Sequence, residues 1–372
     1  MRSGSRLLGG CLAALCVAFA GCKGETPGAG SGAGGSGGGA SGGAKRIVIL
    51  TNGDDPFWDA CEAGAKQAEK DLDLASKGFR VAFERADFTD QGQIDKLKQY
   101  NLQRDIAGVG ISVFNPDSRA VTEELRQLQQ KGVQVVTIDG DLNREKFRDA
   151  RYAYIGTDNI VAGRELGKSA AALRPDGKHV FFVGSTTADN AVARMEGFNE
   201  GAGASFQEIE RLEDGADRPK ARQNVESALD RHRELNALVG IWAYNTPQIV
   251  SVVQDRRIRD AVSVLCFDAA EASIREMEAG NVDVMVVQNP FQMGYDGVRL
   301  LVALAEKDDA QVKEMYPDYA QEGVRDIFRT DLRVVVPNAD SPISAELFEE
   351  GTVFMPLDEF RKWLADRGLV SS

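Results

Sequence analysis

The chain has 372 residues, of which 43% are hydrophobic and 27% charged, and this length and composition predict two domains rather than one. The formal net charge of −13 provides no basic surface for nucleic acid, so we expect no nucleic-acid partner. Only Cys61 and Cys266 follow Cys22 in the sequence, which excludes a disulfide framework. We expect both to be buried as small apolar side chains.

The N-terminus has the layout of a secretion signal, with arginines ahead of an apolar run from residue 7 to 20 and small residues leading to Cys22. The stretch "AFAGC" resembles a bacterial lipobox, in which the cysteine is acylated, although Phe19 replaces the usual aliphatic residue. We therefore expect residues 1–22 to be a lipoprotein signal peptide. An uncleaved membrane anchor is the alternative, but the run is shorter than the ~20 residues that a span needs.

Residues 23–44 are a Gly/Ser tract with too few apolar side chains to fold, and such tracts act as flexible linkers. A lipid on Cys22 followed by this linker predicts a periplasmic or extracytoplasmic protein that is tethered to a membrane.

From residue 45 onward, β-rich runs alternate with helical patterns. The predicted strands are "RIVILTN", "FRVAFERAD", "IAGVGISV", "VQVVTID", "YAYIGT", "HVFFVGS", "LVGIWAY", "VSVLCFD", "VDVMVVQ" and "LRVVVP". Between them lie helical stretches such as "QIDKLKQYNLQRD", "SRAVTEELRQLQQKG" and "EASIREMEAGN". Repetition of strand, helix and strand predicts an α/β fold with parallel sheets covered on both faces, and this many strands predict two such sheets.

The junction "TNGDDPFWDACEAG", residues 51–64, places two adjacent aromatic rings at the start of the first helix. Neighbours in a helix point about 100° apart, so Phe57 and Trp58 cannot both lie on the core stripe that Ala60 and Gly64 would form. At least one ring must face something else. A hydrophobic staple at the helix start is the alternative interpretation.

Polar residues follow most of the predicted strands. They are Asn52, Asp55, Asn115, Asp139, Ser185, Asn245, Asp268 and Gln288. Ligands of open α/β sheets bind outside the carboxyl ends of the strands, so these groups could converge on one cleft. Helix capping and turn formation are the alternative for each of them, although glutamine is a poor cap.

Three features of the sequence could mislead. "AGRELGKSA", residues 162–170, fits a relaxed P-loop, but we expect a helix capped by Asp158 to run through it already. "DGDLNRE", residues 139–145, opens like a calcium loop but lacks its glycine and its bidentate glutamate. The only histidines, His179 and His232, are expected on the solvated surface. We therefore predict no cofactor, no metal and no catalytic residue.

The body from about residue 45 to 338 resembles the bacterial periplasmic sugar-binding proteins of the ribose-binding type, the receptors that supply ABC transporters. The resemblance rests on "TNGDDPFWDACEAGAKQAE", "GVGISVFNPDSRAV", "VQVVTID", "YIGTDNIVAGRELGK", "ARMEGF", "WAYN", "VLCFD" and "MVVQNPFQMGYDGV", which follow in the family's order and spacing. It implies a type I periplasmic binding fold, with two doubly wound parallel-sheet lobes joined by a three-strand hinge.

The resemblance also implies the boundaries of the lobes. Lobe 1 would comprise residues 45–157 and 289–330, and lobe 2 would comprise residues 158–288 and 331–338. The chain would cross between them near Thr157, Gln288 and Asp331. Residues 339–372 extend beyond the usual end of the family. In this extension "LDEFRKWLADRG" predicts an amphipathic helix that packs back on a lobe, with docking of a partner as the alternative.

The family's ligand-binding residues map onto one set of positions in this sequence. They are Asp55, Phe57, Trp58, Asp139, Arg194, Asn245, Asp268 and Gln288. A pyranose has an apolar face that an aromatic ring can cover and a rim of hydroxyls that planar donors and acceptors can bind. Asp55 replaces a common asparagine, Gly140 stands where ribose binders carry an arginine, and Ala216 lies near the place of an aromatic. These departures suggest a roomier site or another sugar.

The sequence thus favours a monomeric solute-binding protein that captures a monosaccharide by hinge closure and delivers it to an ABC transporter permease. A receptor subunit for a histidine kinase or chemoreceptor is the alternative, which neighbouring genes would distinguish. The leader argues against a transcriptional repressor core. A glycosidase with Asp139 and Asp268 would need a raised carboxyl pKa, whereas Arg194 in the same cleft is expected to keep both ionised.

Overall fold

The computed structural model describes residues 43–372. The predicted signal peptide, the acylation of Cys22 and almost all of the predicted linker lie outside the described residues. Residues 43–372 form one compact unit with two β-sheets. No helix in this part of the chain has the length and apolar character needed to cross a membrane.

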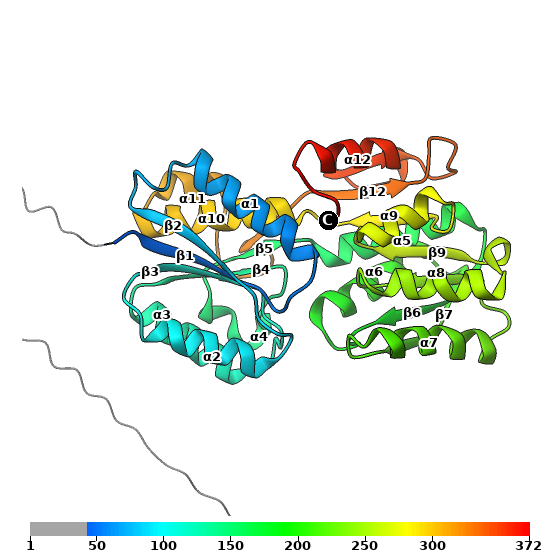
Figure 1. The fold of residues 1–372 in the computed structure, drawn as a ribbon, viewed down its shortest axis with the longest axis horizontal. Helices are drawn as coiled ribbons and strands as arrows, with labels where there is room; N and C mark the ends of the chain where they lie inside the picture. Colours follow the sequence, from blue (N-terminus) through cyan, green and yellow to red (C-terminus); the bar gives the residue numbers. More distant parts are fainter. Residues whose placement is uncertain (1–42) are drawn as a thin grey trace, which may run out of the picture. The chain divides into compact units, whose positions relative to one another are not determined.

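The first sheet has the strand order β11-β5-β4-β3-β1-β2, and all its pairings are parallel (Figure 1). Its strands are β1 (Lys45–Leu50), β2 (Phe79–Glu84), β3 (Ile106–Ile111), β4 (Gln134–Ile138), β5 (Tyr154–Gly156) and β11 (Ile327–Arg329). Helices α1 (Phe57–Asp71), α10 (Pro290–Glu306) and α11 (Asp309–Met315) cover one face, and α2 (Asp90–Asn101) and α3 (Arg119–Gln130) cover the other. The short helix α4 (Arg144–Phe147) follows β4. We call this half lobe 1.

The second sheet has the order β13-β12-β10-β9-β8-β6-β7. Its strands are β6 (Gly177–Val183), β7 (Phe206–Glu213), β8 (Ala237–Gly240), β9 (Ser263–Phe267), β10 (Val284–Val287), β12 (Leu332–Val336) and β13 (Thr352–Pro356). Helices α5 (Asn159–Leu173) and α6 (Asp189–Ala202) pack on one face. Helices α7 (Arg218–Arg231), α8 (Asn245–Arg256), α9 (Glu271–Glu278) and α12 (Leu357–Ala365) pack on the other. We call this half lobe 2.

The predicted α/β fold with two lobes is confirmed, and each predicted strand run contains a strand. One pairing differs from the expected parallel pattern, because β12 runs antiparallel to β10. The chain leaves lobe 2 at the carboxyl end of β10 and returns to it at the start of β12. These two strand ends lie at the same edge of the sheet, so the neighbouring strands run in opposite directions. Strands β7, β11 and β13 were not predicted, since β7 carries many charged residues and β11 has only 3 residues.

The segment that resembles a P-loop is helical, as predicted. Helix α5 runs from Asn159 to Leu173, and the Asp158 side chain accepts a hydrogen bond from the Val161 amide. Gly163 lies where α5 crosses α6, because a Cβ there would stand 2.2 Å from the backbone oxygen of Arg194. The glycine therefore serves helix packing, and it lets α6 approach closely enough to present Arg194.

The prediction for His179 is wrong, because this side chain is fully buried in lobe 2. Its ring packs against Phe181 and Phe198, and its Nε2 lies 3.1 Å from the Asn199 Oδ1. Burial lowers the pKa of His179 to about 4. The prediction that Cys61 and Cys266 are buried free thiols is confirmed.

Candidate functional site

A cavity of about 780 Å³ lies between the two lobes. Its volume falls within the roughly 300–1,000 Å³ that is typical of small-molecule sites. The polar residues that follow β1, β3 and β4 in lobe 1 and β6, β9 and β10 in lobe 2 line it. They are Asn52, Asp55, Asn115, Asp139, Ser185, Asp268 and Gln288. The carboxyl ends of both parallel sheets therefore face one cavity, as expected for open α/β sheets.

The two aromatic side chains at the start of α1 both contact the cavity. Trp58 is only 2% exposed and also belongs to the core of lobe 1, and its Nε1 donates to the Asn52 Oδ1 at 3.1 Å. Phe57 is half-buried and meets Trp58 edge to face, with ring centroids 5.0 Å apart. The Asp55 Oδ1 accepts a hydrogen bond from the Phe57 amide at 3.0 Å, so this carboxylate binds the first amide of α1 while it lines the cavity.

Asp139 follows β4 directly and lies in the left-handed region of backbone space, with φ of 63°, which is a strained conformation for a residue other than glycine. The Tyr154 hydroxyl donates to the Asp139 carbonyl at 3.0 Å and helps to hold it. The carboxylate itself has one side-chain contact, with the Ser112 hydroxyl at 3.5 Å. Burial raises the pKa of Asp139 to about 6, although Arg194 acts in the opposite direction.

Asp268 occupies the matching place in lobe 2, directly after β9, and its φ is also 63°. Its Oδ1 accepts a hydrogen bond from the Gln288 Nε2 at 2.8 Å. Burial raises the pKa of Asp268 as well. Arg194 lowers the pKa of both carboxyl groups, as expected, but burial outweighs the guanidinium, so the net shift is upward for each of them. A pKa of about 6 still leaves Asp139 mostly ionised at neutral pH.

Arg194 projects from α6 and is 1% exposed. Its Nε donates to the Asn159 Oδ1 at 2.9 Å and its Nη1 donates to the Ile241 carbonyl at 3.0 Å. The Nη1 also lies 3.6 Å from the Asp268 Oδ2, and the guanidinium stands over the Phe267 ring, 4.7 Å from its centroid. These contacts fix the plane of the guanidinium beside the cavity.

Asn245 does not line the cavity, which corrects the expectation from the sequence. Its Nδ2 donates to the Asp214 Oδ2 at 2.8 Å, and its Oδ1 accepts from the Trp242 amide at 3.1 Å. The side chain is thus committed to Asp214 and to the turn that precedes α8, so the turn-forming alternative describes it. The neighbours Trp242 and Tyr244 reach the cavity in its place.

Several buried polar atoms at the cavity have no hydrogen-bond partner within the described residues. They are the Thr157 Oγ1, Asn190 Oδ1, Arg194 Nη2, Trp242 Nε1 and Gln288 Oε1. Buried polar groups are almost always paired, so a group of orphaned donors and acceptors at one cavity indicates a polar ligand with several hydroxyls. The sequence did not identify Thr157, Asn190 and Trp242 as cavity residues. Thr157 and Trp242 lie within the motifs "YIGTDNIVAGRELGK" and "WAYN", but the resemblance implies a ligand role for neither of them.

Two of the three departures from the ribose-binding pattern, Gly140 and Ala216, have a structural counterpart. A Cβ on Gly140 would lie 2.6 Å from the Val113 carbonyl oxygen, so the backbone leaves no room for a longer side chain there. Ala216 lines the cavity with φ of 62°, and the rings of Trp242 and Tyr244 provide aromatic surface on the same lobe. The nearby Arg144 also lines the cavity.

In the segment that resembles a calcium loop, two arginines engage Asp141. The Asp141 carboxylate accepts from the Arg151 Nε at 2.8 Å and from the Arg144 Nη1 at 3.0 Å. Asn143 caps the short helix α4. Among residues 43–372 no group of histidine, cysteine and acidic side chains could hold a metal ion.

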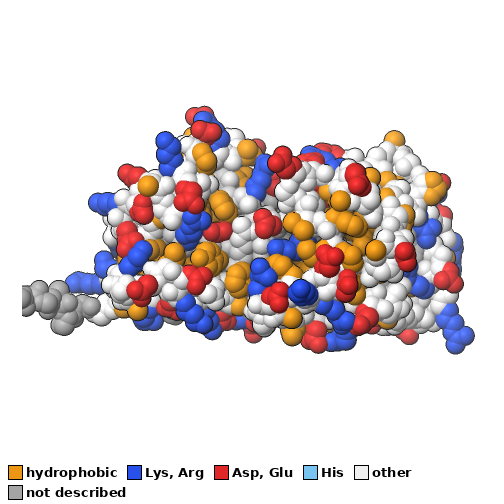
Figure 2. Space-filling model, turned by 90° about the horizontal axis from the view of Figure 1, so that it is seen from above, with side chains coloured by type: hydrophobic (Ala, Val, Ile, Leu, Met, Phe, Trp, Pro, Cys, Tyr) orange, Lys and Arg blue, Asp and Glu red, His pale blue; other side chains and the backbone are white. Residues whose placement is uncertain are grey.

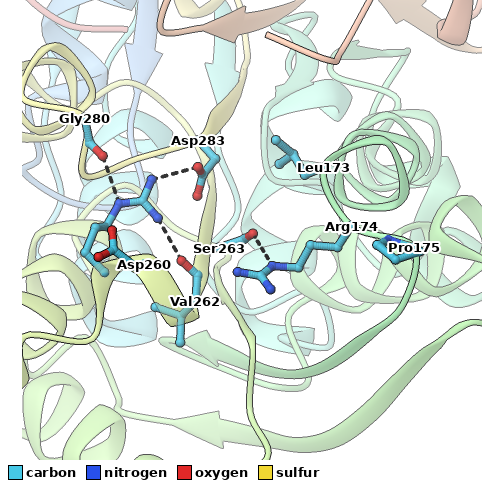
Figure 3. A pocket seen from close by; sticks show the side chains of 9 residues that line it. Leu173, Arg174, Pro175, Asp260, Val262, Ser263, Gly280 and Asp283 are labelled. Carbon is cyan, nitrogen blue, oxygen red and sulfur yellow. Dashed lines mark hydrogen bonds and ion pairs between the residues drawn. The ribbon is translucent and has the colours of Figure 1, made fainter.

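A second cavity of about 560 Å³ lies in lobe 2 near the amino ends of β9 and β10 (Figure 3). Its two arginines are already satisfied by protein groups. The Arg174 Nε donates to the Ser263 Oγ at 2.7 Å, and the Arg259 Nη2 donates to the Asp283 Oδ1 at 2.7 Å. None of the orphaned polar atoms noted above lines this cavity, so it offers much less to a polar ligand.

The surface has no segregated basic area on the face drawn in Figure 2, where acidic and basic side chains are interspersed. Nucleic-acid binding needs clustered cations, and this face does not provide them.

Comparison with known proteins gives consistent results. The family described as "Periplasmic binding protein domain" matches residues 46–309. The D-allose-binding periplasmic protein of Escherichia coli (strain K12) is 24% identical over 273 residues, covering 70% of this chain and 84% of the relative.

Two solved ABC transporter solute-binding proteins share the fold. One, from Burkholderia graminis C4D1M in complex with D-arabinose, has a TM-score of 0.67 and 23% identity and covers 79% of this chain and 96% of its own. The other, from Agrobacterium vitis with bound D-fucose, has a TM-score of 0.68 and 19% identity and covers 80% of this chain and 97% of its own.

Proposed function

The chain belongs to the family of periplasmic binding protein domains, and we propose that it is an extracytoplasmic solute-binding protein for a monosaccharide. The observation that carries this proposal is the gathering of orphaned polar atoms with two buried carboxylates at one interlobe cavity. A pyranose supplies several hydroxyls that both donate and accept, which matches this mixture of groups.

Each side chain has a distinct role in the proposed complex. Asp139 and Asp268 accept hydrogen bonds from ligand hydroxyls from opposite lobes. The free Nη2 of Arg194 and the Nε1 of Trp242 donate to ligand oxygens, and the Oε1 of Gln288 accepts. Phe57 covers an apolar ring face, because it is half-buried and borders the cavity.

Binding is coupled to hinge closure in this proposal. The chain passes between the sheets after β5, after β10 and after β11, near the predicted crossings at Thr157, Gln288 and Asp331. Lobes that are joined by such crossings can bend at them, and periplasmic binding proteins are a general example of hinge closure. The ligand favours the closed state because only there do the carboxylates of both lobes reach it.

The biological setting completes the proposal. The closed form presents its lobes to an ABC transporter permease, and acylated Cys22 with residues 23–44 tethers the monomer to the membrane. No covalent chemistry takes place at the site. The raised pKa values of Asp139 and Asp268 meet one requirement of a glycosidase, so incubation with aryl glycosides is the control that excludes hydrolysis.

A thermal-shift screen of residues 43–372 tests the proposal. The panel contains D-allose, D-arabinose, D-fucose and other pentoses, hexoses and inositols, with calcium and ATP as controls. A rise of several degrees with one sugar class is expected when the ligand is well above its Kd. No rise with any sugar, or a rise with calcium or ATP alone, would contradict a monosaccharide function.

A further inference from the structure

The C-terminal extension, residues 339–372, is built into lobe 2. Strand β13 continues the sheet by pairing in parallel with β12. Helix α12 then buries Phe360 and Leu364 in the core of the lobe, and the Arg361 guanidinium bonds to both carboxylate oxygens of Glu278 on α9. The predicted amphipathic helix that packs on a lobe is thus confirmed. The packing of α12 accounts for a contribution to the stability of lobe 2, but it does not explain the path of the residues that follow the helix.

The last residues leave α12 and run to the back of the candidate site. Ser371 is 7% exposed and Ser372 is 2% exposed. The Ala269 amide donates to the Ser372 carbonyl at 2.8 Å, and the Ser372 amide donates to the Ala269 carbonyl at 3.1 Å. The Ser372 hydroxyl also donates to the Gln288 carbonyl at 3.2 Å. One residue therefore touches both the neighbour of Asp268 and the backbone of Gln288.

Asp268 needs this kind of support. Its positive φ is costly for a residue other than glycine, and such conformations persist when the surroundings over-determine them. Asp139 has the same φ in lobe 1, where the Tyr154 hydroxyl bonds to its carbonyl and Gly140 packs closely behind it. At Asp268 the equivalent support comes from Ser372 on the following residue and from the Gln288 side chain.

The extension also contacts the segments that join the lobes. Trp363 stands between two guanidiniums, with Arg333 at 3.9 Å and Arg367 at 4.4 Å from its ring centroid. Arg333 is buried on β12, next to the point where the chain returns to lobe 2. Arg367 lies 5.8 Å from the ring centroid of Phe291 on α10, which packs in lobe 1. The extension therefore touches two of the three crossings and the first turn of a lobe 1 helix.

We propose that the C-terminal segment is a positioning element of the site, in which Ser371 and Ser372 hold Asp268 and Gln288 in their ligand-facing conformation. Its effect on affinity rests on the proposed sugar-binding function, whereas its effect on the backbone at Asp268 does not. Ser372 is a positioning residue, because it acts through Ala269 and Gln288 and does not line the cavity.

The affinity test compares residues 43–372 with a variant that ends at Val370. The Kd for the sugar found in the screen is expected to rise about tenfold, since two backbone hydrogen bonds behind Asp268 are lost. Ser372→Ala keeps the backbone pairing and is expected to raise the Kd no more than about threefold. An unchanged Kd in the shortened variant would overturn the proposal.

The same deletion made in an Asp268→Ala variant separates an effect on the position of Asp268 from an effect on general stability. In Asp268→Ala the same deletion is expected to raise the Kd no more than about threefold, because only the part of its effect that acts through Gln288 remains. An equal loss of affinity in both backgrounds would overturn the proposal.

Hydrogen exchange of the unliganded protein gives a readout that needs no sugar. The deletion is expected to speed exchange at the amides of Asp268 and Ala269 and to leave those of Asp139 and Gly140, the matched positions in lobe 1, unchanged. If the wild type binds no sugar but this local change occurs, the proposed function fails and the positioning role stands. Unchanged exchange at Ala269, or a uniform increase across lobe 2, would overturn the positioning role.

Discussion

Replacement of Asp268 by alanine removes a cavity carboxylate that its own lobe already holds in place. The Asp268 side chain accepts from Gln288 at 2.8 Å and lies 3.6 Å from the Arg194 guanidinium. A ligand hydroxyl that donates to it forms a charge-assisted hydrogen bond, and the loss of one such bond together with the altered setting of Gln288 is expected to cost about 2–3 kcal/mol. The Kd should therefore rise roughly 30- to 150-fold.

The fold should survive this change. Burial raises the pKa of Asp268, so the ionised carboxylate is itself costly to keep in the folded protein at neutral pH, and its removal relieves that cost. Alanine is strained at a φ of 63°, whereas asparagine tolerates it, so Asp268→Asn is the matched control. Calorimetric titration and thermal melts of both variants check the prediction. Wild-type affinity at an unchanged Tm would remove Asp268 from the site and refute the reasoning.

Three further predictions follow from the site. A ligand hydroxyl that donates to ionised Asp139 lowers the pKa of this carboxyl below its value of about 6 in the unliganded protein. Affinity should therefore be full above pH 6 and fall by up to about tenfold per pH unit below it. Binding titrations across pH check this, and the pH dependence should vanish in Asp139→Asn. Phe57→Ala should weaken binding roughly tenfold with little change in Tm, because the ring is half-buried. An unchanged Kd would leave the ring only the role of a hydrophobic staple at the start of α1. Asn245→Ala should lower the unfolding free energy by about 1–2 kcal/mol in a denaturant titration, since Asn245 bonds to Asp214 and to the Trp242 amide. The Kd should change only about twofold or less. A large loss of affinity at full stability would show that Asn245 belongs to the site.

The convergence of polar residues on one cavity could be predicted because it follows from a rule about whole sheets. Asp139 follows a strand that is buried except at its first residue, and Asp268 follows a fully buried strand. The carboxyl ends of parallel strands meet at one edge of a sheet. The rule needs only the strand order along the chain, so no tertiary contact had to be known. The resemblance to a family added Arg194, which lies in the middle of a helix and has no strand signal.

The residues that could not be predicted depend on partners that are distant in sequence. Asn245 is held by Asp214, which is 31 positions away, and that partner decides that its amide faces the protein and leaves the cavity to others. His179 is buried because Phe198 and Asn199 on α6 pack over it, although its neighbours in the sequence gave no such sign. The raised pKa of Asp139 follows from depth of burial, which a sequence does not state.

The C-terminal extension could also be predicted only in part, because its last residues depend on partners that are distant in sequence. Periodicity predicted the helix that contains Phe360 and Leu364, since both lie on one face. The return of Ser372 to Ala269 depends on a pairing across about a hundred positions, and "LVSS" carries no pattern that would indicate it.

The central claim is that a sugar binds between the lobes through carboxylates from both. Isothermal titration calorimetry of residues 43–372 with the best sugar of the screen, beside an Asp139→Ala/Asp268→Ala variant, tests it most directly. The account predicts one saturable site in the wild type and its loss in a variant that still melts cooperatively. Equal binding by both proteins, or no saturable heat in the wild type, would contradict it.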